Sequence, residues 1–290
     1  MPTRTMMSWC AILLFTACAG ETGTLRVAVS GEEAAVQGWP VDDVGFVDGW
    51  SLTFSTLVVN VGGFELRGAD AARASVDGAD SLVDLRGGVR VLYTLEGIDA
   101  RRWEDVRYVL RPATAASIDE GPVDASVRAR MIEQGWSVYL EATATKDGVT
   151  RTLAWGLDLD VLNRGCVGGD ETDGVVVRAG GVTEAEITLH WDHLFFDSLV
   201  LDDAQMRFDA MSAVADAEGS VTLDALDRQR LADLRDAEGN PLLDTGGAPV
   251  VYDPGSAALP EPTLLHHMRA AATTVGHWNG EGHCDYEVRR

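Results

Sequence analysis

From Thr24 to about Leu201, apolar side chains recur at every second position, and glycine and aspartate break the pattern at short intervals. Successive side chains of a β-strand point to opposite faces of a sheet, so a period of two indicates strands with one buried face. Clear examples are Leu25-Val27-Val29, Val89-Val91-Tyr93-Leu95 and Trp136-Val138-Leu140. We therefore predict a mainly β body, an antiparallel β-sandwich whose core lies between its two sheets.

Turn signals between these segments support the same fold. Asp147-Gly148 lies between two alternating segments, Ser137–Thr145 and Thr150–Asp158. Asp-Gly is a strong signal for a two-residue hairpin turn, so these segments should be antiparallel neighbours. The stretches Ala69–Asp77 and Pro112–Pro122 lack the alternation, and we expect them to be loops between strands.

After Leu201 the composition changes. Segments 204–217 and 223–237 are rich in residues that favour helices, and Thr263–Val275 gathers apolar residues on one helical face. Prolines between 241 and 262 indicate a connecting loop. We predict a small C-terminal helical cap that follows the β-sandwich. The expected divisions are a leader over 1–17, the β-sandwich domain over 18–201 and the helical cap over 202–290.

The leader has the layout of a secretory signal. Arg4 is its only charge before an apolar run from Trp9 to Ala17, and small residues surround Cys18. The run is shorter than the roughly 20 apolar residues that a membrane-spanning helix needs. We therefore expect export without a transmembrane anchor.

Phe15-Thr16-Ala17-Cys18 resembles the lipobox of bacterial lipoproteins, although that family usually has Leu where Phe15 stands. The resemblance implies that Cys18 is lipidated and becomes the new N-terminus, and that Ala19 directs the protein to the outer membrane. Lipid anchoring there, or in the periplasm, is the expected localisation. The alternative is ordinary cleavage after Ala19, which would release a soluble protein that begins at Gly20.

Two cysteines remain beyond the leader and its junction, Cys166 and Cys284. An even pair in an exported protein favours one disulfide. In the chain-entropy model a bridge over this separation contributes on the order of 4–5 kcal/mol. Neither cysteine belongs to a CxxC unit, so a zinc-ligand pair is the weaker alternative.

The formal net charge of −23 limits the classes of partner. Nucleic-acid phosphates require lysine and arginine, so we exclude a nucleic-acid partner. Acidity also disfavours electrostatic adhesion to anionic lipids, which leaves the N-terminal lipid as the expected membrane contact. A protein or glycan partner stays open.

The segment Asp209–Leu226 resembles an EF-hand in its order of helix, glycine turn and helix. Aligned on the loop glycine, the residues at ligand positions are Asp216, Glu218 and Thr222. Val214 stands at the first ligand position and Ala225 at the twelfth, where the family has a bidentate Glu. Calcium needs six to eight oxygen atoms, so the resemblance implies a degenerate hand that does not bind calcium tightly.

The histidines are confined to the last third of the chain: His190, His193, His266, His267, His277 and His283. Strand alternation would separate His190 from His193 unless the chain turns near Trp191. A Cys166–Cys284 bridge would return the loop that carries His277 and His283 to the β-body. Those four histidines with a carboxylate would then suit zinc or copper.

The carboxylates considered for this metal site are Asp192, Asp197 and Glu281. The alternative is that the histidines are separate surface or hydrogen-bonded groups. We expect His266 and His267, on the last helix, to be exposed.

These features predict a non-enzymatic, lipid-anchored envelope protein that binds a divalent metal ion. One alternative is a carbohydrate or protein recognition module that presents exposed tryptophans. Another is a zinc-dependent hydrolase in which Asp192 or Glu281 acts as general base.

Overall fold

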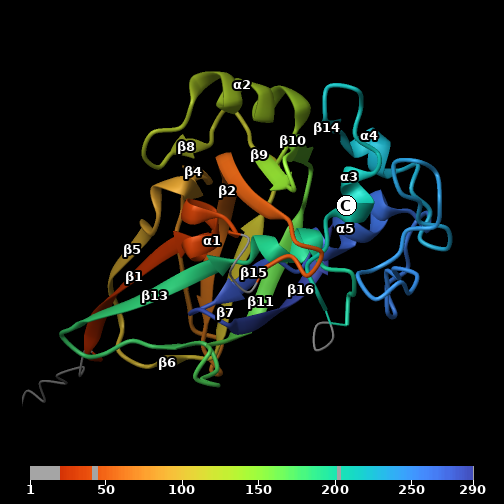
Figure 1. Cartoon of the computed structure of the whole chain (residues 1–290). Helices are drawn as coiled ribbons and strands as arrows, with labels where there is room; N and C mark the ends of the chain where they lie inside the picture. The colour runs from red at the N-terminus through yellow and green to blue at the C-terminus, as the bar shows by residue number, and fades with distance from the viewer. Residues whose placement is uncertain (1–19, 41–44, 201–203, 290) are drawn as a thin grey trace, which may run out of the picture.

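The computed structural model describes residues 20–40, 45–200 and 204–289. The predicted leader, the lipobox-like junction with Cys18 and the expected domain boundary near residue 201 lie outside these residues. Within them, fourteen strands form one large mixed sheet, and two more form a separate small sheet. The prediction of a mainly β protein is confirmed (Figure 1).

The strands and helices have the following bounds. The large sheet contains β1 (Thr22–Ser30), β2 (Ser51–Arg67), β3 (Arg73–Ser75), β4 (Ser81–Asp84), β5 (Arg90–Asp99), β7 (Asp105–Leu110), β8 (Ile118–Asp119), β9 (Val138–Lys146), β10 (Val149–Leu157), β11 (Val161–Val167), β13 (Val182–Leu189), β14 (Ser220–Val221), β15 (Gly276–Trp278) and β16 (Gly282–Val288). The small sheet pairs β6 (Arg102–Trp103) with β12 (Val175–Val176). The helices are α1 (Glu32–Gln37), α2 (Ala125–Gln134), α3 (Asp209–Ser212), α4 (Leu223–Leu226) and α5 (Leu264–Ala272), with 3-10 helices η1 (Leu85–Gly87) and η2 (Trp191–Phe195).

The pairing of the strands differs from the expected antiparallel sandwich of two sheets. The main path of the large sheet runs β14-β10-β9-β2-β7-β11-β16-β15-β13-β1-β5. Two pairings on this path, β1–β13 and β10–β14, are parallel, as is β4–β8 beside the path. Alternation in a sequence reveals which face of a strand is buried but not which strand lies beside it. The expected loops Ala69–Asp77 and Pro112–Pro122 also contain the short strands β3 and β8, which lack a clear alternation because each has only two or three residues. The sequence therefore predicted most of the long strands but not these short ones, and it predicted the partners incompletely.

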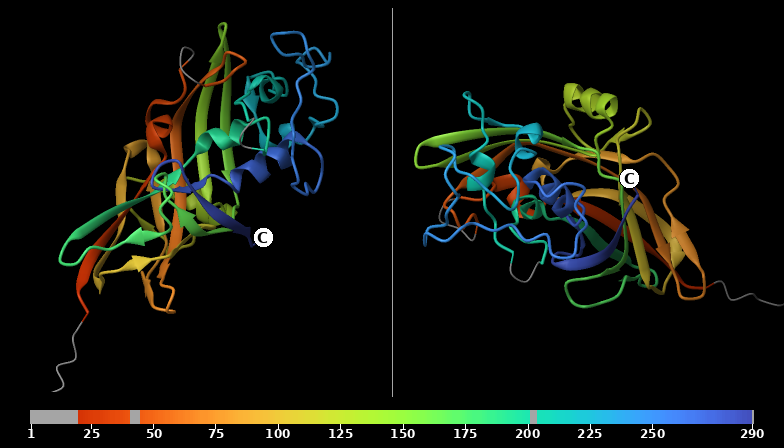
Figure 2. Two further views of the ribbon diagram at one scale, coloured as in Figure 1. Left: turned by 90° about the horizontal axis from the view of Figure 1, so that it is seen from below. Right: turned by 90° about the vertical axis from the view of Figure 1, so that its right-hand side faces the viewer.

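The large sheet curls so that distant strands face one another across a common core (Figure 2). Phe64 on β2 stacks on Tyr93 of β5 with ring centroids 5.5 Å apart, and on Trp278 of β15 at 6.3 Å. The Tyr93 hydroxyl donates a hydrogen bond to the Val61 carbonyl of β2. The hydrophobic core thus lies inside the curled sheet. In a β-sandwich the corresponding core would lie between two separate sheets.

The predicted hairpin is present. β9 and β10 are antiparallel, Lys146 pairs with Val149, and only Asp147 and Gly148 lie between them. Both turn residues have positive φ, 49° and 79°. This is the left-handed conformation that a two-residue primed turn requires, which explains why Asp-Gly stands there.

The C-terminal cap contains less helix than the sequence predicts. The segments 204–217 and 223–237 carry only the single-turn helices α3 and α4, and a long loop leads to α5 (Figure 1). Buried Gln229 donates to the carbonyls of Ala210 and Arg235 and accepts from the Arg235 N–H. These bonds hold the chain in a non-helical path, because tertiary contacts override a weak helix propensity.

The last part of the region assigned to the cap returns to the large sheet. β15 and β16 insert between β13 and β11, in the middle of the sheet. Cys284 on β16 forms a disulfide with Cys166 on β11, as the cysteine count predicted. The bridge thereby holds the strand that follows β15 against the β-body.

Among the described residues, no helix has the length and apolar character needed to cross a membrane.

Candidate metal centre

The candidate metal centre begins where β13 ends. Its last residue, Leu189, precedes His190, whose backbone N–H donates to the Val275 carbonyl at 2.9 Å. The chain then enters η2 at Trp191, so the strand alternation stops. As a result His190 and His193 approach each other, with ring centroids 5.9 Å apart.

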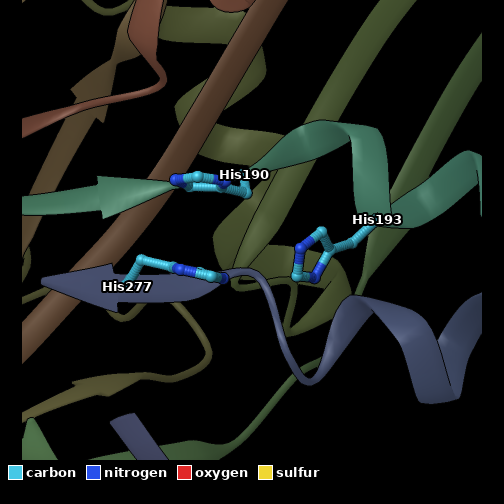
Figure 3. A group of neighbouring side chains, drawn as sticks. All are labelled: His190, His193 and His277. Carbon is cyan, nitrogen blue, oxygen red and sulfur yellow. The ribbon is translucent and has the colours of Figure 1, made fainter. Parts of the chain in front are cut away.

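The third histidine comes from β15. Thr188 and His277 are opposite each other in the antiparallel pair of β13 and β15. Because His190 lies two residues beyond Thr188, its side chain shares the face that carries His277. The rings of His190 and His277 stack with centroids 3.9 Å apart and planes 17° apart, and His193 turns its edge toward them (Figure 3).

The spacing of these rings suits one metal ion. One nitrogen from each of His190, His193 and His277 lies within 4.8 Å of the other two. On a tetrahedral zinc ion, with bonds of about 2.0 Å, neighbouring ligand atoms are about 3.3 Å apart. A nitrogen lone pair lies in the plane of its ring, so one of the two stacked rings must tilt for both to reach the same ion.

Thr274 determines which nitrogen of His193 is available. Its hydroxyl donates to the Ala271 carbonyl at 2.8 Å and lies 2.7 Å from Nδ1 of His193. A hydroxyl has a single hydrogen, so toward the imidazole it must accept, and Nδ1 carries the proton. The lone pair of neutral His193 is then on Nε2, which remains free for a metal ion.

Burial keeps His193 and His277 uncharged at neutral pH. Desolvation, followed by the nearby His277 and His190, lowers the pKa of His193 from 6.5 to about 3. Desolvation, with His190 next, lowers the pKa of His277 to about 4. Only a neutral imidazole coordinates a metal, so both rings are in the ligating form over the whole physiological range.

Two carboxylates approach the outer side of His190. Glu32, at the start of α1, has Oε1 3.6 Å from Nε2 of His190, and Glu281 has Oε2 4.0 Å from Nδ1. Burial raises the pKa of Glu32; charge on His190 opposes this, and the carboxylates of Glu281 and Asp192 add to it. Glu32, His190 and Glu281 form a second group whose ligand atoms lie within 4.8 Å of one another.

The other residues predicted for the metal site lie outside both groups. His283 is paired with His277 across β15 and β16, but its side chain is exposed. Asp192 is partly buried on η2, and this burial raises its pKa. Asp197 instead forms an ion pair with Arg207 at 2.6 Å.

The expectation that His266 and His267 are exposed is wrong for His267. Its side chain is 1% exposed, its ring packs on Tyr252, and its Nε2 donates to the Phe196 carbonyl at 3.0 Å. Burial lowers the pKa of His267. His266 is half-buried, with Nδ1 3.0 Å from the Thr263 hydroxyl. Neither belongs to the metal centre.

The residues of the EF-hand-like segment have other partners. Oδ1 of Asp216 accepts from the backbone N–H groups of Glu218 and Ser220 at 3.1 and 2.8 Å. The Thr222 hydroxyl accepts from the N–H of Ala225 and caps α4. The backbone thus already uses one oxygen of Asp216 and the hydroxyl of Thr222.

The tryptophans that could stack on a sugar are mostly in the core. Of those in the described part of the chain, six are buried: Trp39, Trp50, Trp103, Trp155, Trp191 and Trp278. The remaining one, Trp136, is half-buried and stacks on Tyr139 with centroids 5.5 Å apart. The described residues therefore present no fully exposed tryptophan for carbohydrate recognition.

Sequence reasoning missed two residues of the centre, Glu32 and Thr274. Glu32 follows the first strand, whereas His190 comes only after β13, so no local spacing in the sequence connects them. Thr274 stands close to His277, but a threonine in that position is as typical of a helix end as of a histidine partner. Only the folded arrangement assigns these two side chains to the site.

Comparison with known proteins offers no relative from which a function could be transferred. No protein-family model, curated protein or solved structure matches this chain. The chemistry of the site residues is therefore the basis for a functional proposal.

Proposed function

We propose that this protein is an exported, lipid-anchored envelope protein that binds one divalent transition-metal ion through His190, His193 and His277. The observation that carries the proposal is the convergence of three imidazoles within 4.8 Å, two of them buried and one half-buried. A common metal ion would account for the convergence of three imidazoles from two separate segments of the chain on one space.

The ligand set points to zinc or copper. Imidazole nitrogen suits these borderline metals, whereas calcium and magnesium prefer a shell of oxygen atoms. The Thr274 hydroxyl supports His193 in the way that outer hydrogen bonds orient metal-binding histidines in known sites. The ion would hold β13 and β15 together, a role that needs no catalysis.

Export and anchoring are supported by sequence and by the disulfide. A Cys166–Cys284 bridge suits an oxidising compartment. The signal-like leader and the lipobox-like junction at Cys18 add the route and the anchor. Together they favour an envelope location, at the outer membrane or in the periplasm.

Elemental analysis of protein purified from its native envelope without added metal tests the proposal. We expect zinc or copper bound to the chain, and we expect His193→Gln to remove it. His266→Gln is the matched control, because that half-buried histidine lies outside the centre. Metal-free protein that also fails to take up zinc or copper at micromolar concentration would contradict the proposal.

A second candidate is a zinc-dependent hydrolase, favoured by the presence of three histidines rather than four. Catalytic zinc sites keep a coordination position for water, and Glu281, whose Oε2 is 4.0 Å from Nδ1 of His190, or the partly buried Asp192 would serve as general base. Hydrolysis of a chromogenic ester by the zinc-loaded protein, lost in His193→Gln, would favour this candidate over a purely binding role.

A further inference from the structure

The second group, Glu32, His190 and Glu281, shares its histidine with the proposed metal centre. Only 7% of the His190 side chain is exposed, and its Nε2 has no hydrogen-bond partner. An unpartnered nitrogen in such a position needs a ligand, because a buried polar atom without one is costly. The atom nearest to it among the carboxylates is Oε1 of Glu32, at 3.6 Å.

That distance is too long for a hydrogen bond, which would bring nitrogen and oxygen to about 2.7–3.2 Å. It is close to the separation of two atoms that bind the same ion, since zinc bonds of about 2.0 Å put tetrahedral neighbours about 3.3 Å apart. Oε2 of Glu281 lies on the other edge of the ring, 4.0 Å from Nδ1 of His190. The Glu281 side chain is 84% exposed, so its carboxylate can rotate toward an ion that binds on the Nε2 side of the ring.

The backbone of Glu32 gives a separate indication that its position is selected. Its φ is 54°, in the left-handed region that a residue with a Cβ adopts only at a cost. Glycine would occupy this conformation without strain. Such strain is typical of residues whose side chain has a function, and here the side chain of Glu32 points to His190.

We propose that Glu32 and Glu281 bind a second divalent transition-metal ion on Nε2 of His190, so that His190 bridges two ions. The inference rests on the proposed function, because the other nitrogen of the ring serves the first ion. Binding of the second ion displaces the remaining N–H proton of the imidazole, which leaves to solvent. No oxidation or reduction is involved, and the two carboxylates with the imidazolate balance the added positive charge.

The stoichiometry of zinc binding tests the bridge. Metal-depleted protein is dialysed against zinc, with excess magnesium to occupy weak acidic sites on this strongly negative chain. We expect two zinc ions per wild-type chain and one in Glu32→Gln/Glu281→Gln. Glu33→Gln is the matched control and should keep two, because Glu33 is the next residue on α1 and contacts Gln37 instead.

Copper supplies a second measurement that does not depend on counting ions. Two Cu²⁺ ions joined by an imidazolate couple antiferromagnetically. The paramagnetic resonance signal should therefore rise with the first equivalent of Cu²⁺ and fall with the second. In Glu32→Gln/Glu281→Gln it should rise to one equivalent and stay constant.

The outcomes separate the two proposals. A wild-type chain that binds one zinc ion, lost in His193→Gln, would overturn the bridge and leave the proposed function intact; Glu32 would then only orient His190. Two ions that persist in Glu32→Gln/Glu281→Gln would also overturn it. A wild-type chain that binds no zinc or copper would remove both proposals.

Discussion

The imidazole rings of His190 and His277 lie face to face, with centroids 3.9 Å apart and planes 17° apart. His277 lies on β15 and His190 directly follows β13, and these two strands are neighbours in the middle of the large sheet. The rings can stack this closely because burial keeps His277 uncharged, and two imidazolium ions would repel each other. The stack therefore joins the two halves of the candidate centre before any ion arrives.

Replacing Thr274 by valine should weaken metal binding without removing a ligand. The variant loses the hydroxyl that holds Nδ1 of His193, and with it the preference for a lone pair on Nε2. Loss of such outer partners typically costs roughly 10–100-fold in affinity. Competition with a chromogenic chelator gives the zinc affinity of both proteins. Thr273→Val is the control, because the Thr273 hydroxyl bonds only the Ala270 carbonyl and its loss should leave the affinity unchanged.

The stability of the metal-free protein should fall as pH falls below about 6.5, the ordinary histidine pKa. The folded-state pKa is about 3 for His193 and about 4 for His277, so between these values and 6.5 the unfolded chain binds more protons. The contribution of these buried neutral histidines to the free energy of unfolding is complete above pH 6.5 and is lost as the pH falls toward 4. The loss is at most about 1.4 kcal/mol per pH unit for each histidine.

Urea unfolding between pH 7 and pH 5, in the presence of a chelator, measures this slope. His193→Gln should flatten it, and His283→Gln, which changes an exposed histidine, should not. A free energy of unfolding that stays constant over this range would show that these histidines are not buried in the neutral form.

Removing the disulfide should destabilise the fold substantially. The bridge joins residues 118 positions apart, which the chain-entropy model values at about 4–5 kcal/mol, and strain reduces such figures in practice. We expect Cys166→Ser/Cys284→Ser to lower the free energy of unfolding by about 2–5 kcal/mol, as denaturant titration measures. Zinc affinity should also fall, because β16 no longer holds β15 in place.

The EF-hand-like segment should not bind calcium tightly. The positions of the first and twelfth ligands hold Val214 and Ala225, and one oxygen of Asp216 is already bonded to two backbone N–H groups. Calorimetric titration of calcium should show no micromolar isotherm. One that appears in the wild type and vanishes in Asp216→Ala would contradict this prediction.

Lipid anchoring depends on Cys18. Cys18→Ser should change a protein extracted with the membrane into one that is soluble or retains its leader, which fractionation and N-terminal mass analysis distinguish. Native protein found in the soluble fraction with Gly20 as a free N-terminus would favour ordinary signal cleavage instead.

Local patterns in the sequence predicted local structure well. Alternation located most of the long strands of the β-body, Asp147-Gly148 located a hairpin, and the remaining cysteines paired as their number required. The short spacing between His190 and His193 indicated a shared site if the chain turned between them, and η2 supplies that turn. Each of these inferences involves residues close in sequence or a choice among very few partners.

Features that depend on tertiary contacts were not predictable in the same way. The helix expected over 223–237 is interrupted because buried Gln229 bonds the backbone around it, a contact invisible to propensity. His267 was expected at the surface, because the sequence does not show that Tyr252 covers it. Glu32 reaches His190 only through the curl of the sheet, and no pattern in the sequence links the two.

The position of β15 and β16 has a consequence for how the protein is made. These strands follow all the other described strands in the sequence, yet they fill the gap between β11 and β13 in the middle of the sheet. Until they arrive, a nascent or prematurely terminated chain exposes two unpaired strand edges, which are templates for aggregation. Insertion of the C-terminal strands closes that gap and brings His277 to His190 in the same event. A loaded metal centre would therefore mark a chain whose synthesis has passed β16 and whose large sheet has closed.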